Sequence, residues 1–418
     1  MTVNKKTELQ KLLKKLEGGG AGGGSSMETG NDREERSACC NIKLRWIQIV
    51  YRLLVNVDAL NMVESVGNVT RRRTVPVIVP RAPGQYVVRW VPAVSGESLA
   101  HRYQMEIVEL AKTKYTECSS RIDYWSEQGE LLKHWDLGFY QKQCQQAEQG
   151  KAPKPRGWEC DLANRYAGRR EGFSLSDLQD IEKRIVDNSL VEDIGGFLVT
   201  QGPTRRTSCI RFSYLIPTLD AIEATQLDHQ MHVRGALKAQ SLRLPGYEEA
   251  IQVPYYVQVG SVLYGGNIEL DLCCVGSYSI AGGCVEDKEC TLTLRRCVAL
   301  DALRPLLEGD FGAKRSRYRP HNVTELVIAV LSDRPVPLPP ATLPLENLVE
   351  ELKRKLDDYK KLNVDVKLVA YVTAALGSNY AERLRQLIGR LPGVEITNTI
   401  PDLIGRIRDN VGLQCTAR

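Results

Sequence analysis

Arginine and lysine side chains gather with small residues in three short segments of the chain, and this combination suits the binding of phosphate. The segments span residues 65–73, 202–206 and 312–319, and each lies at the end of a predicted strand or helix. Guanidinium groups stay charged and donate paired hydrogen bonds to phosphate oxygens, while glycine and serine let a backbone approach closely. One such segment alone would as readily be a solvated charge run. Three of them, with a fourth basic stretch at 151–170, favour a polyanionic ligand.

The third segment, within "FGAKRSRYRP", also places an aromatic ring among the basic side chains. Tyr318 could stack on an unpaired base while neighbouring arginines hold phosphates, a combination typical of proteins that bind single strands. The body of the protein is not strongly basic. Residues 1–26 hold five lysines and two glutamates, so they carry +3 of the net +5, and only +2 remains on the rest of the chain. A nucleic acid would therefore bind to local patches.

Residues that could support catalysis or hold a metal are sparse. The chain contains no G-x-x-x-x-G-K-[ST], H-E-x-x-H or G-x-S-x-G motif. His229 and His232, next to Asp228, are the best metal candidate, but such a grouping is commonly coincidental. Asp58 follows the first strand without a second acid nearby, so a structural role is favoured over a catalytic one. We expect no metal, no cofactor and no enzymatic activity.

The twelve cysteines raise the question of zinc or disulfides. No C-x-x-C pair is present, which argues against a zinc site. Cys273 and Cys274 lie in the apolar run "IELDLCCV", and we interpret them as small core residues. Disulfides stay open for the cysteines between 284 and 297, because hyperthermophiles are an exception to the rule that intracellular proteins lack them.

The first 26 residues differ in character from the rest. A short amphipathic stretch precedes the linker-like "GGGAGGGSS", and Met27 resembles a second start. We interpret residues 1–26 as a fusion leader, with a natural tail as the alternative. Because the N-terminus lacks an apolar signal-peptide core and no apolar run approaches the roughly 18 residues of a membrane span, we expect a cytoplasmic protein without membrane contact.

Strands and helices must hold the basic segments at their ends. They interleave with long insertions, which predicts an α+β fold whose antiparallel sheet carries helices on one face. A strand is predicted over 44–57, a hairpin over 74–92 with its turn at Pro83–Gly84, and a helix capped by Ser95. Two further strands are predicted to join at Gly265–Gly266. Other predicted elements are a helix at 175–187, a helix at 289–308, a strand at 323–332, and an alternating tail of helix 345–361, strand 364–373, helix 379–390, strand 393–398 and helix 400–411.

A series of stretches, in this order, resembles the DevR-type backbone subunit of archaeal type I-A CRISPR effector complexes. They read "NVDALNMVESVGNVTRRRTV", "VPAVSGESLAHRYQ", "DIGGFLVTQGPTRRTSCIRFSYLIPT", "VLYGGNIELDL", and "AKRSRYRP" with "VTELVIAVLSDRPVP". The resemblance implies a modified RRM-like (ferredoxin-like) palm with two insertions. The implied parts are a discontinuous palm over 45–112 and 175–418, whose C-terminal part is 345–412, a finger-like helical insertion over 113–174 and a thumb-like insertion over 220–255.

The resemblance also implies a function. Copies would stack head to tail as a helical homo-oligomer along the spacer of a CRISPR RNA (crRNA), grip its backbone without sequence preference, and present its bases to a target DNA strand, alongside other Cascade subunits. Together with the basic segments, it suggests these RNA contacts: Asn61, Ser65, Asn68, Arg71, Arg72, Arg73, Ser95, Gly96, Ser98, His101, Arg102, Arg205, Arg206, Arg234, Lys314, Arg315, Arg317 and Arg319. A packed or capping role is as good an interpretation of His101.

Two other functions stay open. One is an RNA-processing ribonuclease on the same palm, and the other is a nucleic-acid-binding regulator that acts alone. Related type III backbone subunits cut target RNA with an acid in the first loop, where this chain offers Glu64 beside a dense run of arginines. Because no second acid accompanies Glu64, we predict no cleavage. The sequence does not say which of Arg71, Arg72 and Arg73 would touch RNA.

Overall fold

The computed structural model describes residues 39–66, 69–132, 134–169, 171–235, 252–312 and 315–415. The leader predicted over residues 1–26 lies outside these ranges. Within them strands and helices interleave, so the fold is mixed α+β, as predicted. From Ile42 onward the chain is one unit by its internal contacts. None of the helices in the described ranges is both long enough and apolar enough to cross a membrane.

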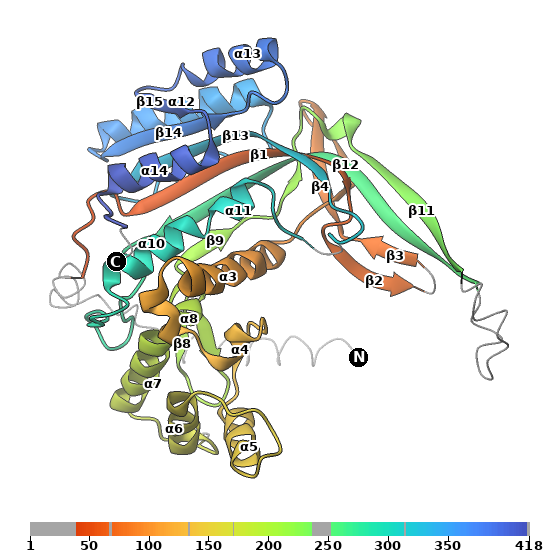
Figure 1. The fold of residues 1–418 in the computed structure, drawn as a ribbon. Coiled ribbons are helices and arrows are strands. Elements are labelled where there is room, and N and C mark those ends of the chain that lie inside the picture. Colours follow the sequence, from red (N-terminus) through yellow and green to blue (C-terminus); the bar gives the residue numbers. More distant parts are fainter. Residues whose placement is uncertain are drawn as a thin grey trace, which may run out of the picture. The chain divides into compact units, whose positions relative to one another are not determined.

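A mixed sheet of ten strands forms the centre of the described part of the chain (Figure 1). Its middle strand β1 (Trp46–Asp58), close to the predicted strand at 44–57, pairs antiparallel with β13 (His321–Ser332) on one side and β12 (Gln252–Asp271) on the other. Most residues of β1 and β13 are buried. Their near-continuous apolar runs are typical of strands that are covered on both faces.

The sheet continues past β13 into the C-terminal part of the chain, which alternates as predicted. Its elements are α12 (Leu345–Lys361), β14 (Val366–Val372), α13 (Ser378–Ile388), β15 (Val394–Thr397) and α14 (Ile400–Val411). Leucine, isoleucine and valine side chains of α12 and α13 pack on one face of β13 and β14. α14 contacts β13 and β14 and also packs on α10 (Leu292–Asp301) and α11 (Arg304–Leu307), which together replace the single helix predicted at 289–308.

The prediction of an antiparallel sheet with helices on one face is wrong in two respects. β15 runs parallel to β14, and β3 (Val69–Arg72) runs parallel to β12, so the sheet is mixed. Both faces of β13 are also covered. Ile328 belongs to the cluster under α12 and α13, yet its neighbour Val327 is equally buried. Successive side chains of a strand point to opposite faces, so burial of both requires a layer on each side.

One long strand, β12, replaces the two strands that were predicted to join at Gly265–Gly266. Both glycines pair with β1, where Gly265 lies opposite Arg52 and Gly266 opposite Tyr51. A β-carbon on Gly265 would lie 2.7 Å from the backbone carbonyl carbon and oxygen of Ala341. The glycines therefore make room for a close approach of the chain and form no turn.

The outer half of β12 belongs to a two-stranded ribbon with β11 (Gln226–Gly235) (Figure 1). Along its other edge, β12 pairs with β3, which pairs in turn with β2 (Met62–Val66). The inner half of β12 pairs with two short strands, β9 (Ile210–Phe212) and β10 (Ile216–Pro217). A short helical turn, η2 (Ile222–Ala224), leads from β10 to β11. The ribbon thus connects the centre of the sheet to the β2–β3 hairpin.

The hairpin predicted over 74–92 is present as β4 (Thr74–Ala82) and β5 (Gln85–Pro92), with Pro83 and Gly84 in its turn. It forms a separate two-stranded sheet. The predicted helix follows it as α3 (Gly96–Thr113), with Ser95 as its N-cap. The hairpin and α3 therefore both start next to the first basic segment.

A group of short helices between α3 and β9 has an apolar core of its own. The core holds Trp135, Tyr140, Leu162 and Ile185, and the Trp135 and Tyr140 rings stack with centroids 4.6 Å apart. The elements are η1 (Thr116–Arg121), α4 (Tyr124–Glu127), β6 (His134–Trp135), α5 (Leu137–Glu148), α6 (Gly157–Tyr166), α7 (Leu175–Asn188), α8 (Leu190–Gly195), β7 (Phe197–Val199) and β8 (Arg205–Arg206). α7 confirms the helix predicted at 175–187.

All of the cysteines are disulfide-bonded. The pairs include Cys118–Cys290, Cys144–Cys160, Cys209–Cys274 and Cys297–Cys415. Cys273 and Cys274, interpreted as small core residues, both form disulfides; Cys273 is buried and Cys274 is half-buried. The disulfide alternative for cysteines 284–297 is confirmed. The apolar run around Cys274 gave no sign of pairing, because its partner Cys209 lies 65 residues away in the sequence.

Candidate nucleic-acid interface

One asparagine ties the open end of the β2–β3 hairpin to the start of α3. The Asn61 side-chain oxygen accepts hydrogen bonds from Arg73 Nε at 2.9 Å and from the Ser95 backbone N–H at 3.1 Å. The Asn61 backbone carbonyl accepts a third from the Arg73 N–H at 2.8 Å. Asn61, which was predicted to contact RNA, thus fixes the first basic segment beside the N-terminus of α3.

The three consecutive arginines face different surroundings. β3 turns Arg72 inward, where its side chain is fully buried, whereas Arg71 is exposed and Arg73 is half-buried. Arg72 Nη2 lies 2.6 Å from Asp58 Oδ1 and donates to the Tyr264 hydroxyl. The prediction that Arg72 contacts RNA is therefore wrong, because a guanidinium enclosed in the core does not reach a phosphate. Arg71 and Arg73 keep their places as candidates.

Asp58 is a structural residue, as its sequence context indicated. Its side chain has no exposed surface, and the backbone N–H of Leu60 donates to Oδ1 at 3.2 Å. Burial raises the pKa of Asp58, and the guanidinium of Arg72 opposes that rise. A buried pair of this kind is costly to break, since removal of one partner leaves the other charge without compensation.

The start of α3 is organised by its cap. Ser95 Oγ accepts from the Ser98 N–H at 3.3 Å, and the Ser95 N–H donates to Asn61, so the polar atoms of this buried serine are used within the chain. Gly96 packs against β9, because a β-carbon there would lie 2.8 Å from the Phe212 carbonyl oxygen. Ser95 and Gly96 therefore build the helix terminus. The N–H groups in the first turn of a helix are the ones that suit an anion.

Asp310 holds two of the candidate arginines. Arg102 donates through Nε to the Asp310 carbonyl at 2.9 Å and through Nη2 to its carboxylate at 3.2 Å, and Arg315 donates to the same carboxylate. Arg102 also pairs with Glu106 at 2.9 Å. Burial acts to raise the pKa of Asp310, but Arg315 and Arg102 together hold that pKa below its ordinary value. These contacts join α3 to the third basic segment and offset part of its charge.

His101 lies on the exposed surface of α3, one turn after the cap. It borders a shallow pocket of about 540 Å³, which Ser98, Met105 and Gly312 also line. The carboxylate-bearing residues Glu106 and Glu109 share this pocket. The pocket connects α3 to the start of the third basic segment.

Tyr318 packs against the ring of His232, which in turn packs on a third aromatic ring. Its hydroxyl lies 2.6 Å from His232 Nε2, and the two rings meet edge to face with centroids 5.6 Å apart. The His232 ring in turn stacks on Tyr255, with centroids 5.3 Å apart and planes inclined by 25°. His232 and Tyr255 are cross-strand partners on β11 and β12. Neither ring could be recognised in the sequence as a neighbour of Tyr318, because the pairing of β11 with β12 brings His232 and Tyr255 together.

This aromatic trio anchors the third basic segment beside the first. Tyr318 and Tyr255 pack with Met62 of β2 against the buried Ala59 and Val257. Arg317 and Arg319, on either side of Tyr318 in the sequence, are exposed. The fold therefore brings the β2–β3 hairpin, the start of α3 and residues 315–319 together beside the β11–β12 ribbon.

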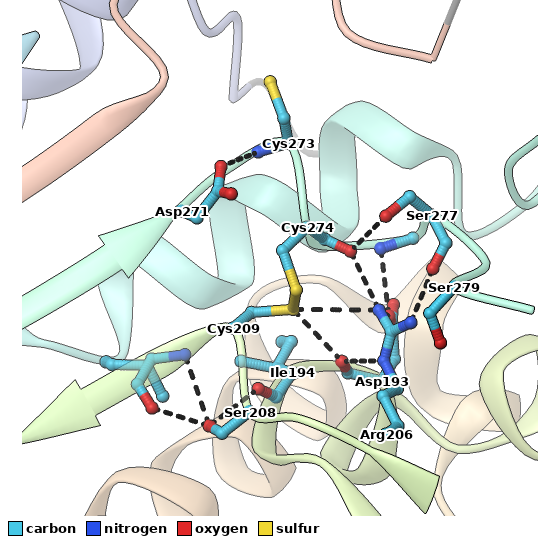
Figure 2. The surroundings of a disulfide bond; sticks show 12 residues. Asp193, Ile194, Arg206, Ser208, Cys209, Asp271, Cys273, Cys274, Ser277 and Ser279 are labelled. Carbon is cyan, nitrogen blue, oxygen red and sulfur yellow. Dashed lines mark hydrogen bonds and ion pairs between the residues drawn. A yellow bond between two sulfur atoms is a disulfide. The ribbon is translucent and has the colours of Figure 1, made fainter. Parts of the chain in front are cut away.

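The second basic segment belongs elsewhere in the fold. Arg205 and Arg206 form β8, which pairs with β7 in a small sheet beside the short helices. Figure 2 shows Arg206 directed at Asp193, with Nη2 2.7 Å from Asp193 Oδ1, next to the Cys209–Cys274 disulfide. Arg206 also donates to the carbonyl of Cys274 at 2.8 Å. The prediction that Arg206 contacts RNA is wrong, since its side chain is buried; Arg205 is exposed.

The carboxylate of Asp193 is buried, and two arginines, Arg206 and Arg295, compensate its charge. Its second oxygen, Oδ2, accepts from Arg295 Nη1 at 3.0 Å, and the Gly276 N–H donates to Oδ1 at 2.9 Å. Arg295 donates further to the carbonyls of Val186 at 2.8 Å and Asp187 at 2.7 Å. This network connects α8, the loop after β12 and α10, so the role of Arg206 is to hold the fold together.

The side chains of the remaining predicted RNA contacts lie outside the described part of the structure. Asn68 and Lys314 lie outside the described residues. Ser65 on β2 and Arg234 on β11 are described by their backbone alone. In the described part of the chain no group of three or more His, Cys, Asp and Glu side chains is arranged to hold a metal ion.

Most of this chain is similar in sequence to known proteins. A family model described as "CRISPR-associated negative auto-regulator DevR/Csa2" matches residues 49–353. The "CRISPR-associated aCascade subunit Cas7/Csa2 2" of Saccharolobus solfataricus is 31% identical over 364 residues, which are 86% of this chain and 98% of the relative. The "CRISPR-associated protein Cas7/Csa2 1" of the same organism is 32% identical over 330 residues, which are 78% of this chain and 92% of the relative.

A solved structure resembles the fold as a whole. A chain of a "CRISPR RNA-guided surveillance complex, pre-nicking" superposes with a TM-score of 0.51 at 12% sequence identity. The match covers 88% of this chain and 100% of that chain. At so low an identity, this similarity speaks for a shared fold and not for shared side-chain roles.

Proposed function

The chain belongs to the DevR/Csa2 family of CRISPR-associated proteins, and from that premise we propose that it is a crRNA-binding backbone subunit of a type I-A Cascade complex. In this role copies stack head to tail along the spacer of the crRNA and grip its backbone without reading its sequence. The bases are left free to pair with a target DNA strand, and other Cascade subunits complete the assembly. The assembly works in the cytoplasm.

The meeting of two basic segments with the start of α3 is the observation that carries this proposal. Arg71, Arg317 and Arg319 are exposed, and the segments that carry them lie with a set of aromatic rings beside the β11–β12 ribbon. Arginines bind phosphates of any sequence, and aromatic rings stack on any base. Such a surface suits a protein that holds a strand and leaves its specificity to base pairing.

We assign the parts of the fold accordingly. The central strands β1, β12 and β13 with α3 correspond to an RRM-like palm, and the C-terminal elements from α12 to α14 extend it. The helices from α4 to α6 correspond to the finger, and the β11–β12 ribbon corresponds to the thumb. The similarity in fold to a chain of a surveillance complex supports this assignment.

Binding of RNA through phosphates is tested by salt dependence. Arg71→Ala and Arg317→Ala should each weaken binding to a single-stranded RNA and lower the slope of log K against log salt by roughly 0.7. Arg354→Ala, on the exposed face of α12, is the matched control and should leave the slope unchanged. Equal slopes in all four proteins, including the unaltered chain, would contradict an RNA interface at this place.

Assembly is tested by electron microscopy of the protein with a crRNA. The backbone role predicts evenly spaced copies along the spacer. A one-to-one complex would favour a regulator that acts alone. Cleavage of a complementary RNA in Mg²⁺, abolished by Glu64→Ala, would favour the ribonuclease and overturn the proposal that the chain is not an enzyme.

A further inference from the structure

The β4–β5 hairpin carries an uncovered apolar face. Its register places Pro76 opposite Trp90, Ile78 opposite Val88 and Pro80 opposite Tyr86. All six residues are exposed, with Ile78 at 66% and Trp90 at 69%. Cross-strand partners project from the same face of a sheet, so these side chains form one continuous surface. We call this surface the outer hairpin face.

The opposite face of the hairpin is packed on the protein. Val79 and Val91 are buried against Ile222 of η2, and Val75, Val77 and Leu219 pack at the margin. The hairpin is therefore held firmly, and its exposed apolar face is not the result of a loose loop. Contiguous apolar patches on a protein surface commonly mark a binding site.

The charges of the hairpin argue against RNA as the occupant. None of the six residues of the outer hairpin face is charged. The hairpin's two arginines, Arg81 and Arg89, are both paired with Glu223, at 2.7 Å and 2.9 Å. A nucleic-acid surface needs cations that phosphates can reach, whereas a depletion of charge with aromatic and aliphatic residues is typical of the core of a protein–protein interface.

We propose that the outer hairpin face docks on a second copy of this chain, in a head-to-tail contact between neighbours on the RNA. This inference rests on the proposed function, because an open row of copies needs a heterologous interface. The hairpin is also placed for it: β4 begins at Thr74, directly after Arg73 of the first basic segment. A copy seated on the hairpin would therefore lie next to RNA held by that segment.

The size of the face sets how strong this contact is. Nine residues of β4 span about 30 Å, so the face offers on the order of 300 Å², less than the roughly 800 Å² per partner of a stable complex. Copies should therefore stay apart in dilute solution without RNA. On one RNA they are tethered at high effective concentration, and the contact appears as cooperative binding.

The test compares two substitutions of matched exposure. Ile78→Glu places a charge in the outer hairpin face, and Leu362→Glu places one at an isolated apolar position, 64% exposed, after α12. Binding is measured to an RNA that holds several copies and to one that holds a single copy, with thermal unfolding to verify the fold. Ile78→Glu and Trp90→Glu should lose cooperativity and at least about tenfold in affinity on the long RNA, and change less than twofold on the short one. Leu362→Glu should match the unaltered chain on both.

Other occupants give other results, each of which would overturn the proposal. A loss of affinity on the short RNA as well would assign the face to nucleic acid. A closed dimer without RNA, disrupted by Ile78→Glu, would mean that two outer hairpin faces pack on each other. A deletion of residues 1–26 that changes cooperativity as Ile78→Glu does would assign the face to that segment. If the chain binds no RNA, the proposed function fails; weak self-association at high concentration, measured by sedimentation and sensitive to Ile78→Glu but not Leu362→Glu, would still support the docking face.

Discussion

Arg71 and Arg72 are adjacent residues with opposite environments, one at the surface and the other paired with buried Asp58. Arg72→Ala should lower the free energy of unfolding by about 3–5 kcal/mol, because it leaves the Asp58 carboxylate buried without its partner. Arg71→Ala should change stability by less than about 1 kcal/mol. Urea unfolding monitored by circular dichroism measures both.

A double substitution separates the charge from the packing. Replacing both Asp58 and Arg72 by leucine removes the pair without leaving one charge buried, so this variant should be more stable than Arg72→Ala. If Arg72→Ala unfolds no more easily than Arg71→Ala, the buried pair has no structural role. Arg72 would then return to the list of RNA contacts.

The sequence could not distinguish these arginines, because the direction of a side chain depends on the register of its strand. β3 is only four residues long and pairs with β12, which lies almost 190 residues away in the sequence at Tyr256. The same limit applies to Arg205 and Arg206. Their local pattern is a run of two cations, and the partners that bury Arg206, among them Asp193 and the Cys274 carbonyl, lie in other elements.

A buried carboxylate makes the helical part of the protein sensitive to pH. Burial raises the pKa of Glu159 to about 7, against the hydrogen bond from the Arg156 N–H, and the nearby Asp123 adds to the rise. Burial also raises the pKa of Glu192, which lies close to the same aspartate. The folded state therefore holds protons that the unfolded chain releases near pH 4.5. The stability that these bound protons contribute is fully present below pH 4.5 and is lost as the pH rises through 7.

Glu159→Gln should flatten this dependence. Thermal unfolding of the unaltered protein is expected to show a Tm that decreases between pH 5 and pH 8, by an amount on the order of 2 kcal/mol in unfolding free energy. The variant should lose much of that decrease, since its side chain does not ionise. Glu148→Gln, at the exposed end of α5, serves as the control and should follow the unaltered protein. Parallel curves for all three proteins would exclude Glu159 as the titrating group.

At the scale of elements, β12 contains two glycines, Gly265 and Gly266, where the local sequence pattern wrongly indicated a turn between two strands. Neither Gly265 nor Gly266 has a positive φ, so both are extended residues within the strand. Gly265→Ala should cost about 1–3 kcal/mol or more, because its β-carbon would press on the backbone of Ala341 and Thr342, which has little room to move. Gly405→Ala is the matched control: α14 leaves open space there, and alanine favours helix, so stability should rise by about 0.5–1 kcal/mol. Equal effects in chemical denaturation would contradict the close approach.

Elements whose signals are local were predicted well, and those defined by distant partners were not. α12 and α14 match their predicted ends, since the amphipathic periodicity of each helix lies within its own segment and Thr399 caps α14. Ser95 gave the start of α3 in the same way. β12 was divided at its glycines because the approach of Ala341, more than 70 residues later, leaves no mark on the local pattern.

For the molecule as a whole, disulfides join parts of the chain that are far apart in sequence. Cys118–Cys290 closes a span of 172 residues and Cys297–Cys415 one of 118, whereas Cys144–Cys160 closes only 16. Cross-links stabilise mainly by limiting the unfolded chain, more so for longer loops. The disulfides therefore hold the helical part and the C-terminus to the region around α10.

Loss of a disulfide should destabilise the protein more when that disulfide closes a longer span of the chain. Replacing Cys297 and Cys415 together by alanine should cost between about 4 and 5 kcal/mol, and the same change at Cys144 and Cys160 about 3 kcal/mol, if chain entropy dominates. Thiol titration of the denatured, unreduced protein should detect no free cysteine, and full reduction should expose all twelve. Native-state thiols, or an unchanged Tm in reductant, would contradict the bonding seen here. A reversed order of the two double variants would show that local packing, and not the length of the closed loop, determines what each disulfide contributes.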